Sequence, residues 1–241
     1  MQKQNFKKSI YILPNLFTSM NLFCGYYSIT ATIQLRFVDA AIAILIGAVF
    51  DLLDGKIARA THTTSKFGVE YDSLADLITF GLAPALLMFL WVLESIGRPG
   101  WSAALLFTIC GALRLARFNT SKSSGIDFEG LPIPAAAAMN VSAVLFFYRL
   151  QISPESFKLI FMILMFALSF CMVSSFRYKS LKKVSFFKSM KFNKLVMLVL
   201  VFVAFATEPY IFLFVVFSLY VVSGPVLSLL YHHTSKTEKA I

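Results

Sequence analysis

Four aspartates in the first third of the chain have the spacing of a cation site. Asp51 and Asp54 are three residues apart, and Asp72 and Asp76 are four residues apart. Residues three or four apart lie on one side of an α-helix, so each pair presents its carboxylates from one helix face. If the two faces meet, Mg²⁺ or Mn²⁺ would offset the repulsion between the carboxylates and keep coordination positions open for phosphate oxygens. The aspartates therefore predict a metal site for a phosphorylated substrate.

Two residues beside these aspartates also suit a phosphate. Gly55 would let a ligand group approach the helix backbone, and it equally suits close packing of two membrane helices, so both interpretations stay open. Arg59 lies four residues later and carries a planar guanidinium that matches phosphate oxygens. An isolated arginine near a helix end is typically an interfacial anchor. Next to four carboxylates, phosphate binding is the favoured interpretation.

Together with Ala58 and Gly68, these residues form a longer pattern with set gaps. It reads Asp51, two residues, Asp54 and Gly55, two residues, Ala58 and Arg59, eight residues, Gly68, three residues, Asp72, three residues and Asp76. This pattern resembles the signature of the CDP-alcohol phosphatidyltransferases. The resemblance implies an integral membrane enzyme, usually dimeric, that displaces CMP from a CDP-linked lipid or alcohol with a second alcohol and uses two divalent metal ions.

The resemblance implies that Asp51, Asp54, Asp72 and Asp76 are metal ligands. Asp76 is also implied to be the base that takes the proton of the attacking hydroxyl. Metal ions that bridge a diphosphate stabilise both the attacking and the departing oxygens, and a positioned base contributes about 10²–10⁴-fold to the rate. The motif contains no Ser-His or Cys-His pair. We therefore expect direct in-line attack rather than a covalent enzyme intermediate.

The same resemblance implies contacts with the cytidine nucleotide. Gly55 and Arg59 correspond to residues that hold the nucleotide and its phosphates, and Ser65 matches a Ser or Thr position with the same assignment. The stretch PNLFT resembles the start of the first spanning helix of the family, where Asn15 and Thr18 face the nucleotide.

Two further segments carry information about the acceptor alcohol. RLARFN at 114–119 and GLPIPAAAA at 130–138 resemble segments of the membrane-bound phosphatidylserine synthases of bacteria, a class within this family. The resemblance implies CDP-diacylglycerol and L-serine as substrates. Arg114 and Arg117 share a helix face near Asn119, and a guanidinium can hold the serine carboxylate through two hydrogen bonds. These arginines equally fit anchors on the cytoplasmic side, and glycerol 3-phosphate or inositol phosphate would also need arginines, so their chemistry leaves the acceptor open.

A divalent-cation transporter is an alternative from another functional class, with the aspartates as the permeation site. Transport favours acidic residues near the bilayer midplane and internal symmetry. Here the acids cluster at the ends of two helices beside Arg59, whose charge would repel cations. Transport is therefore the disfavoured interpretation.

These residues must be held by membrane helices. Hydrophobic residues make up 58% of the 241 and charged residues 14%, against about 45–50% and about 25% in soluble domains, and the mean hydropathy is +0.76. A membrane helix needs about 20 apolar residues. We predict an all-α polytopic bundle of eight spans, with six or seven also possible. The expected helices lie near 10–33, 37–60, 72–94, 101–118, 134–150, 156–175, 194–206 and 209–231.

The basic residues predict the orientation of this bundle. A net charge of +10 would suggest nucleic acid in a soluble protein, but in a membrane protein it indicates anionic lipids rather than nucleic acid. On alternate sides of the expected spans, most of the 22 Lys and Arg fall on one side, as in cytoplasmic loops. The exceptions are Arg36, Arg98, Arg149 and Lys158. Both termini and the active site are thus predicted at the cytoplasmic face of a bacterial inner membrane.

The chain is expected to divide into four stretches. Residues 1–9 form a basic cytoplasmic N-terminus, 10–150 the catalytic helices, 151–231 the C-terminal membrane helices and 232–241 a cytoplasmic tail. The resemblance covers about 10–150, whereas the later helices are recognised by hydropathy. The first apolar stretch is interrupted by Pro14 and lacks a small-residue cleavage site, so we expect it to be retained.

Overall fold

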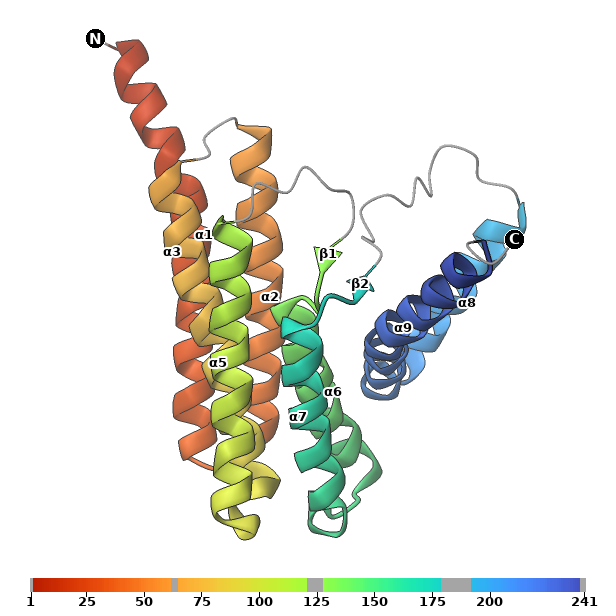
Figure 1. The fold of residues 1–241 in the computed structure, drawn as a ribbon. Helices are drawn as coiled ribbons and strands as arrows, with labels where there is room; N and C mark the ends of the chain where they lie inside the picture. The colour runs from red at the N-terminus through yellow and green to blue at the C-terminus, as the bar shows by residue number, and fades with distance from the viewer. Residues whose placement is uncertain (1, 62–64, 121–127, 179–191, 239–241) are drawn as a thin grey trace.

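The structure is a computed structural model that describes residues 2–61, 65–120, 128–178 and 192–238. Most of the basic stretch from 177 to 194 and the end of the expected tail lie outside these ranges. In the described part the chain is almost entirely helical, as expected, and its helices form a bundle (Figure 1). The helices are α1 (Gln2–Ile33), α2 (Phe37–Ala60), α3 (Lys66–Asp76), α4 (Ala83–Met88), α5 (Arg98–Thr120), α6 (Ile133–Leu150), α7 (Lys158–Val173), α8 (Phe192–Thr207) and α9 (Pro209–Glu238).

α3 and α4 belong to one continuous rod that ends at Ile96. They are joined by η1 (Leu77–Leu82), a π-helical segment, and followed by the π-helical η2 (Phe89–Leu93) and the 3₁₀ turn η3 (Glu94–Ile96). Inside α-helices, π-helical turns are rare and are frequent at functional sites. Here η1 begins directly after Asp76, so the irregular helix geometry lies next to the predicted metal ligands.

The helices expected from hydropathy are all present, but the start of the third was predicted wrongly. It was expected near residue 72 and begins at Lys66. The cause is Ser65, whose hydroxyl accepts a hydrogen bond from the backbone N–H of Gly68 at 3.0 Å and thereby caps the helix. The first helix also begins earlier than expected, at Gln2. Hydropathy marks the apolar middle of a helix and misses its polar first turns.

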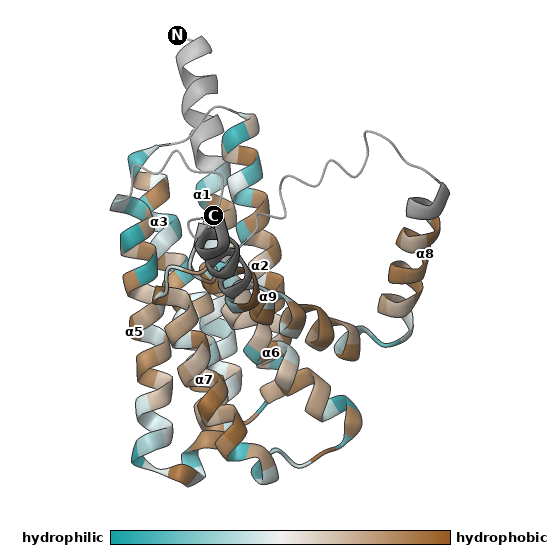
Figure 2. Ribbon diagram, turned by 45° about the vertical axis from the view of Figure 1, so that its right-hand side comes forward, coloured by the Kyte–Doolittle hydropathy of each residue, from teal (hydrophilic) through white to brown (hydrophobic). Residues whose placement is uncertain are grey.

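Five of the described helical segments are long and apolar enough to cross a membrane. α1 and α2, with 32 and 24 residues, are not among these five, and α2 carries five charged side chains. Figure 2 shows apolar residues along the lower bundle and polar residues at the upper ends of α2 and α3. The five segments are Lys66–Ile96, Arg98–Thr120, Ile133–Leu150, Pro154–Val173 and Pro209–Ser228. The architecture is that of a polytopic membrane bundle.

α1 and α2 share the most extensive helix contact of the bundle because small residues line it. On α2, Ala40 and Ala41 are completely buried and Ala43 nearly so. Gly47 extends this small-residue face, and a Cβ there would lie 2.8 Å from Cγ2 of Thr79 in η1. Small residues allow close backbone approach where lipid offers no hydrophobic driving force. α1, α2 and η1 thus pack in direct contact below the cleft described next.

Two short strands pair the connection between α5 and α6 with the connection between α7 and α8. β1 (Phe128–Glu129) and β2 (Arg177–Tyr178) pair antiparallel and lie above the upper ends of α6 and α7, on the side toward α9 (Figure 1). Tyr178 is completely buried, its hydroxyl donates to the carbonyl of Val221 at 3.3 Å, and burial raises the pKa of the phenol. A Cβ at Gly224 would collide with the Tyr178 ring. This pair of strands, called the strap below, therefore docks on α9.

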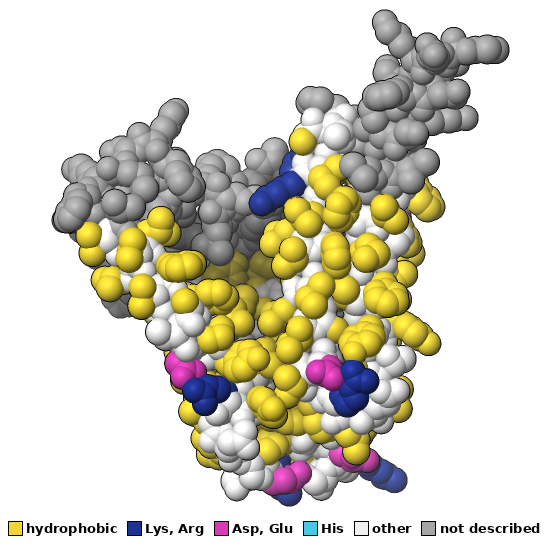
Figure 3. Space-filling view, turned by 180° about the vertical axis from the view of Figure 1, so that it is seen from behind, with side chains coloured by type: hydrophobic (Ala, Val, Ile, Leu, Met, Phe, Trp, Pro, Cys, Tyr) yellow, Lys and Arg dark blue, Asp and Glu magenta, His cyan; other side chains and the backbone are white. Residues whose placement is uncertain are grey.

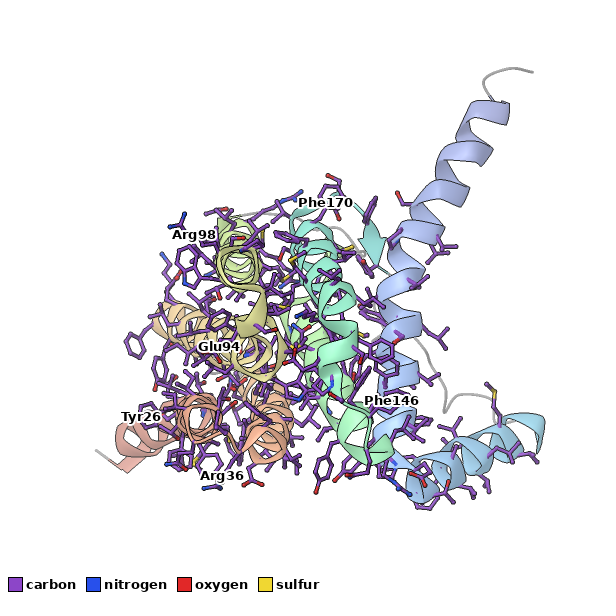
Figure 4. All side chains as sticks on the ribbon, turned by 90° about the horizontal axis from the view of Figure 1, so that it is seen from below. Tyr26, Arg36, Glu94, Arg98, Phe146 and Phe170 are labelled. Carbon is purple, nitrogen blue, oxygen red and sulfur yellow. The ribbon has the colours of Figure 1, made fainter. Side chains whose placement is uncertain are left out.

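α6 packs against both α2 and α9 and so connects the first helices of the bundle to the last one. Figure 4, seen from below, shows α6 and α7 between the first five helices and α9. The rings of Phe146 and Phe214 stack with centroids 4.5 Å apart. At the lower end, Arg149 donates to Glu208 through Nη2 at 2.7 Å and Nε at 2.9 Å. In Figure 3, hydrophobic side chains cover the back of the molecule, and the acidic side chains visible there gather toward the lower end.

Candidate active site

A cleft of about 380 Å³ opens between α2, α3, α5 and the start of α6. Its lining residues come from the C-terminal parts of α2 and α5, from α3 and from the first turn of α6. All four predicted aspartates line it, together with two arginines of opposite walls, Arg59 from α2 and Arg114 from α5. The structure therefore brings the two predicted carboxylate pairs together and adds positive charge on both sides.

Three of the aspartates form a compact group. One carboxylate oxygen from each of Asp51, Asp72 and Asp76 lies within 4.8 Å of the others. Asp76 is 8% exposed, and Oδ1 of Asp72 is buried without a hydrogen-bond partner among the described residues. Three close carboxylates and a buried acceptor without a donor fit a hard divalent cation, which prefers oxygen ligands. The side chains present thus suit Mg²⁺ or Mn²⁺.

Asp54 stands beside this group rather than within it. Its side chain is buried, and Oδ2 accepts a hydrogen bond from the hydroxyl of Thr18 at 2.9 Å. It also interacts electrostatically with Arg59. Among the described residues, three of the four carboxylates thus form the compact group, while the fourth is hydrogen-bonded to Thr18 of α1.

A second cavity of about 170 Å³ adjoins the cleft on the side of Asp54. The guanidinium of Arg59 lies over Gly55, where a Cβ would be 3.4 Å from Nη1. The cavity is lined by every residue expected to contact the nucleotide, namely Asn15, Thr18, Gly55, Arg59 and Ser65. These residues come from α1, from α2 and from the N-cap of α3, so no single helix could present all of them.

Gly68 of the sequence pattern has a local explanation in this cavity. A Cβ at Gly68 would lie 3.2 Å from the hydroxyl of Ser65 and 3.4 Å from Oδ1 of Asn15. The lack of a side chain lets the first turn of α3 approach both polar groups. Ser65 consequently both caps α3 and lines the cavity.

The three residues expected to bind the acceptor are not all in the cleft. Arg114 and Asn119 line it, whereas Arg117 is not among its lining residues. Nη1 of Arg117 donates to the carbonyl of Val173 at 3.4 Å, at the end of α7. Arg114 is partly buried and interacts electrostatically with Asp76, and its Nε is buried without a partner among the described residues. Arg114 is thus the acceptor candidate whose position fits a bound anion.

Asn119 links two walls of the cleft. Its Nδ2 donates to the hydroxyl of Ser73 at 3.0 Å and to Oε2 of Glu70 at 3.2 Å. Both partners lie on α3, so the amide ties the end of α5 to the helix that carries Asp72. Ser73 lines the cleft as well, and sequence reasoning did not single it out.

Sequence reasoning also missed Asn21. Its Nδ2 donates to Oδ1 of Asp76 at 3.0 Å, and its side chain is completely buried. Asn21 lies three residues after Thr18, on the same face of α1. An amide side chain in an apolar helix, in phase with a predicted site residue, is the signal that could have revealed it.

The sequence of the chain is similar to those of known transferases. A family model described as CDP-alcohol phosphatidyltransferase matches residues 11–226. A Helicobacter pylori protein named CDP-diacylglycerol–serine O-phosphatidyltransferase is 42% identical over 89% of this chain and 90% of its own length. An archaetidylserine synthase of Methanothermobacter thermautotrophicus is 36% identical over 70% of each chain. A Bacillus subtilis protein with the same name as the Helicobacter one is 38% identical over 52% of this chain and 70% of its own.

Proposed function

The chain belongs to the CDP-alcohol phosphatidyltransferase family, and from this premise we propose that it transfers the phosphatidyl group of CDP-diacylglycerol to the hydroxyl of L-serine and releases CMP. Serine is proposed as the acceptor because the chain is 42% identical, over 89% of its length, to the Helicobacter pylori protein named CDP-diacylglycerol–serine O-phosphatidyltransferase. Transfer to glycerol 3-phosphate or inositol phosphate is the alternative within the family.

The proposed reaction is a direct displacement at the lipid phosphorus. The serine oxygen forms a bond to that phosphorus, the bond from the phosphorus to the CMP oxygen breaks, and CMP leaves. The hydroxyl proton passes to the carboxylate of Asp76, which we propose as the base. Its burial supports this role, because a base in a water-poor cleft loses fewer protons to solvent.

We propose that Asp51, Asp54, Asp72 and Asp76 hold two divalent ions, Mg²⁺ or Mn²⁺. Such ions, when bound, neutralise the diphosphate and the charge that develops on the departing CMP. The close approach of three of the carboxylates supports this assignment.

The smaller cavity is the proposed nucleotide site. Arg59 would hold phosphate oxygens with its guanidinium, next to the uncovered backbone at Gly55. Asn15, Thr18 and Ser65 supply neutral polar groups in the same cavity. This cavity adjoins the cleft that contains the carboxylates, so a CDP-lipid could place its cytidine in one and its diphosphate in the other.

Arg114 is the proposed partner of the serine carboxylate. Nε of Arg114 is buried without a partner among the described residues, and such an N–H gains more from a carboxylate than an exposed one would. Asn119 lies at the rim of the same cleft and could contact the serine amino group through its carbonyl oxygen. Arg117 is proposed only as a further basic residue near the rim, since its guanidinium contacts the end of α7.

The acceptor is tested with purified protein, CDP-diacylglycerol and Mg²⁺ or Mn²⁺. CMP release is measured with L-serine, glycerol 3-phosphate and inositol phosphate in turn, and each reaction is repeated with a chelator. We expect release with serine only and its loss with the chelator. Release with glycerol 3-phosphate but not with serine would refute the proposal. Because one relative is named an archaetidylserine synthase, an ether-linked CDP-lipid is included as a second donor.

The proposal extends to the setting of the enzyme. We propose eight spans, both termini and the active site at the cytoplasmic face of the bacterial inner membrane, contact with anionic lipids, and a homodimer. The division into a basic N-terminus, catalytic helices up to 150, C-terminal helices and a tail is part of this proposal. The low polarity of the described segments and the position of the basic residues in the sequence support it.

A further inference from the structure

Asp76 is held by a residue of α1 that lies outside the family pattern quoted above. Nδ2 of Asn21 donates to Oδ1 of Asp76 at 3.0 Å, and both side chains are buried. An ionised carboxylate only accepts hydrogen bonds, so the amide must turn its NH₂ group toward Asp76. Hydrogen bonds to a charged group are among the stronger ones, and more so away from water. The contact therefore restricts the orientation of the Asp76 carboxylate.

Asn21 is itself anchored by η1. The hydroxyl of Thr79 donates to the backbone carbonyl of Asn21 at 3.0 Å. Thr79 lies three residues after Asp76, within the π-helical segment. The continuous rod of α3 and η1 thus carries both Asp76, at the end of α3, and Thr79, which holds the backbone of Asn21, and this closes a loop of contacts between α1 and the rod.

Two glycines make this arrangement sterically possible. A Cβ at Gly25 would collide with the hydroxyl of Thr79, and a Cβ at Gly47 would lie 2.8 Å from Cγ2 of Thr79 and 3.0 Å from Oδ1 of Asn21. Thr79 is therefore enclosed between α1 and α2. The backbones of Gly25 and Gly47 pack directly against Thr79, and that of Gly47 also against the side chain of Asn21. A backbone yields less than a side chain, so Asn21 has little freedom to move away from Asp76.

Resting on the proposed function, we propose that Asn21 is a positioning residue for the transfer: it holds Oδ1 of Asp76 and leaves the other carboxylate oxygen for the ion and the acceptor hydroxyl. Thr79 supports Asn21 in this role. Partners of this kind behind a metal ligand typically contribute 10–100-fold to metal affinity or activity. A packing role alone would affect folding but not one step of the reaction.

The test compares Asn21→Leu with wild type in the full-length protein. Turnover at saturating Mn²⁺, the KM for CDP-diacylglycerol and Mn²⁺ binding without substrate, measured by electron paramagnetic resonance, are determined for each. We expect turnover to fall at least tenfold and the Mn²⁺ dissociation constant to rise about tenfold, with KM for the CDP-lipid within threefold of wild type. Unchanged turnover and Mn²⁺ binding would overturn the proposal, as would a loss explained entirely by a smaller folded fraction.

Asn140→Leu is the matched control. Asn140 is also completely buried, and both polar atoms of its side chain lack a partner among the described residues. Its replacement removes an amide without removing a hydrogen bond, so turnover should stay at the wild-type level. A tenfold loss there would show that any buried amide matters equally and would overturn the specific role of Asn21.

Thr79 supplies a second test if Asn21→Leu does not fold. Thr79→Ser keeps the hydroxyl that donates to Asn21, whereas Thr79→Val keeps the shape and loses it. We expect Thr79→Ser to retain turnover and Thr79→Val to lose at least threefold, and equal behaviour of the two would contradict the proposal. The choice of acceptor is separate: if wild type uses another alcohol, the proposed function fails while the Asn21 effect can be measured with that alcohol.

Discussion

The four aspartates of the cleft have different surroundings. Oδ1 of Asp76 accepts a hydrogen bond from Asn21, whereas Oδ2 of Asp54 accepts one from Thr18. Asp76 belongs to the group of three close carboxylates, and Asp54 faces the smaller cavity as well. A substitution at Asp76 should therefore affect the proposed proton transfer. A substitution at Asp54 should also affect binding of the nucleotide in the smaller cavity.

Asp76→Asn should separate chemistry from binding. The amide cannot take the proton of the acceptor, so we expect CMP release to fall by about 10²–10⁴-fold. CDP-diacylglycerol should still bind, because the smaller cavity is unchanged. Release is measured by CMP formation and binding by calorimetry. Asp39→Asn is the control, since Asp39 is exposed and pairs with Arg36 at 2.7 Å at the opposite end of the bundle. Normal turnover by Asp76→Asn would rule out the base role.

The sequence predicts residues whose role depends on type and spacing, and fails where the role depends on packing. The spacing of the aspartates indicates their convergence, since each pair shares a helix face. The contact of Asn21 with Asp76 depends instead on how α1 packs against η1. Arg117 shows the converse case, because its spacing suits the cleft while its guanidinium reaches the carbonyl of Val173. Local periodicity cannot decide between such partners.

At the scale of elements, hydropathy identifies the helices and misses what interrupts or joins them. The π-helical η1 contacts α1 through Thr79, and no pattern of apolar residues indicates either the π-helical geometry or this contact. The early start of α3 depends on one capping hydroxyl, that of Ser65. The strands of the strap have two residues each, too few for a strand signal. Since η1 begins directly after Asp76 and Ser65 lines the smaller cavity, sequence reasoning is weakest where the site is assembled.

Gly224→Ala should loosen the strap from α9. A Cβ at this position would collide with the ring of Tyr178, which is buried and packs 5.6 Å from Tyr220. Overpacking of this kind costs about 1–3 kcal/mol. We expect a lower thermal unfolding temperature in detergent and faster proteolysis near the strap.

Val222→Ala is the control for this change. Val222 is 57% exposed on the same helix, so its truncation should leave both measurements near wild type. If Gly224→Ala unfolds at the wild-type temperature, the docking of the strap on α9 contributes little to stability.

At the scale of the whole molecule, the two ends of the bundle carry different chemistry. Among the described residues the lower end holds two ion pairs, Arg36 with Asp39 and Arg149 with Glu208, each at 2.7 Å. Their charges cancel locally, so this end lacks the excess of basic residues that marks a cytoplasmic face. The other end carries the carboxylate group, Arg59 and Arg114. Substrates made in the cytoplasm would reach the cleft only if that end faces inward.

Cysteine labelling tests this orientation. Gln34 lies in the exposed turn between α1 and α2, and Thr61 is exposed where α2 ends at the other side. Cys24, Cys110 and Cys171 are buried, and their replacement by alanine gives a background for single cysteines. In intact bacterial cells a membrane-impermeant maleimide should label Gln34→Cys, whereas Thr61→Cys should be labelled only after permeabilisation. The reverse pattern would place the carboxylates on the outer face, away from cytoplasmic CDP-lipid, and would contradict both the orientation and the proposed access of serine.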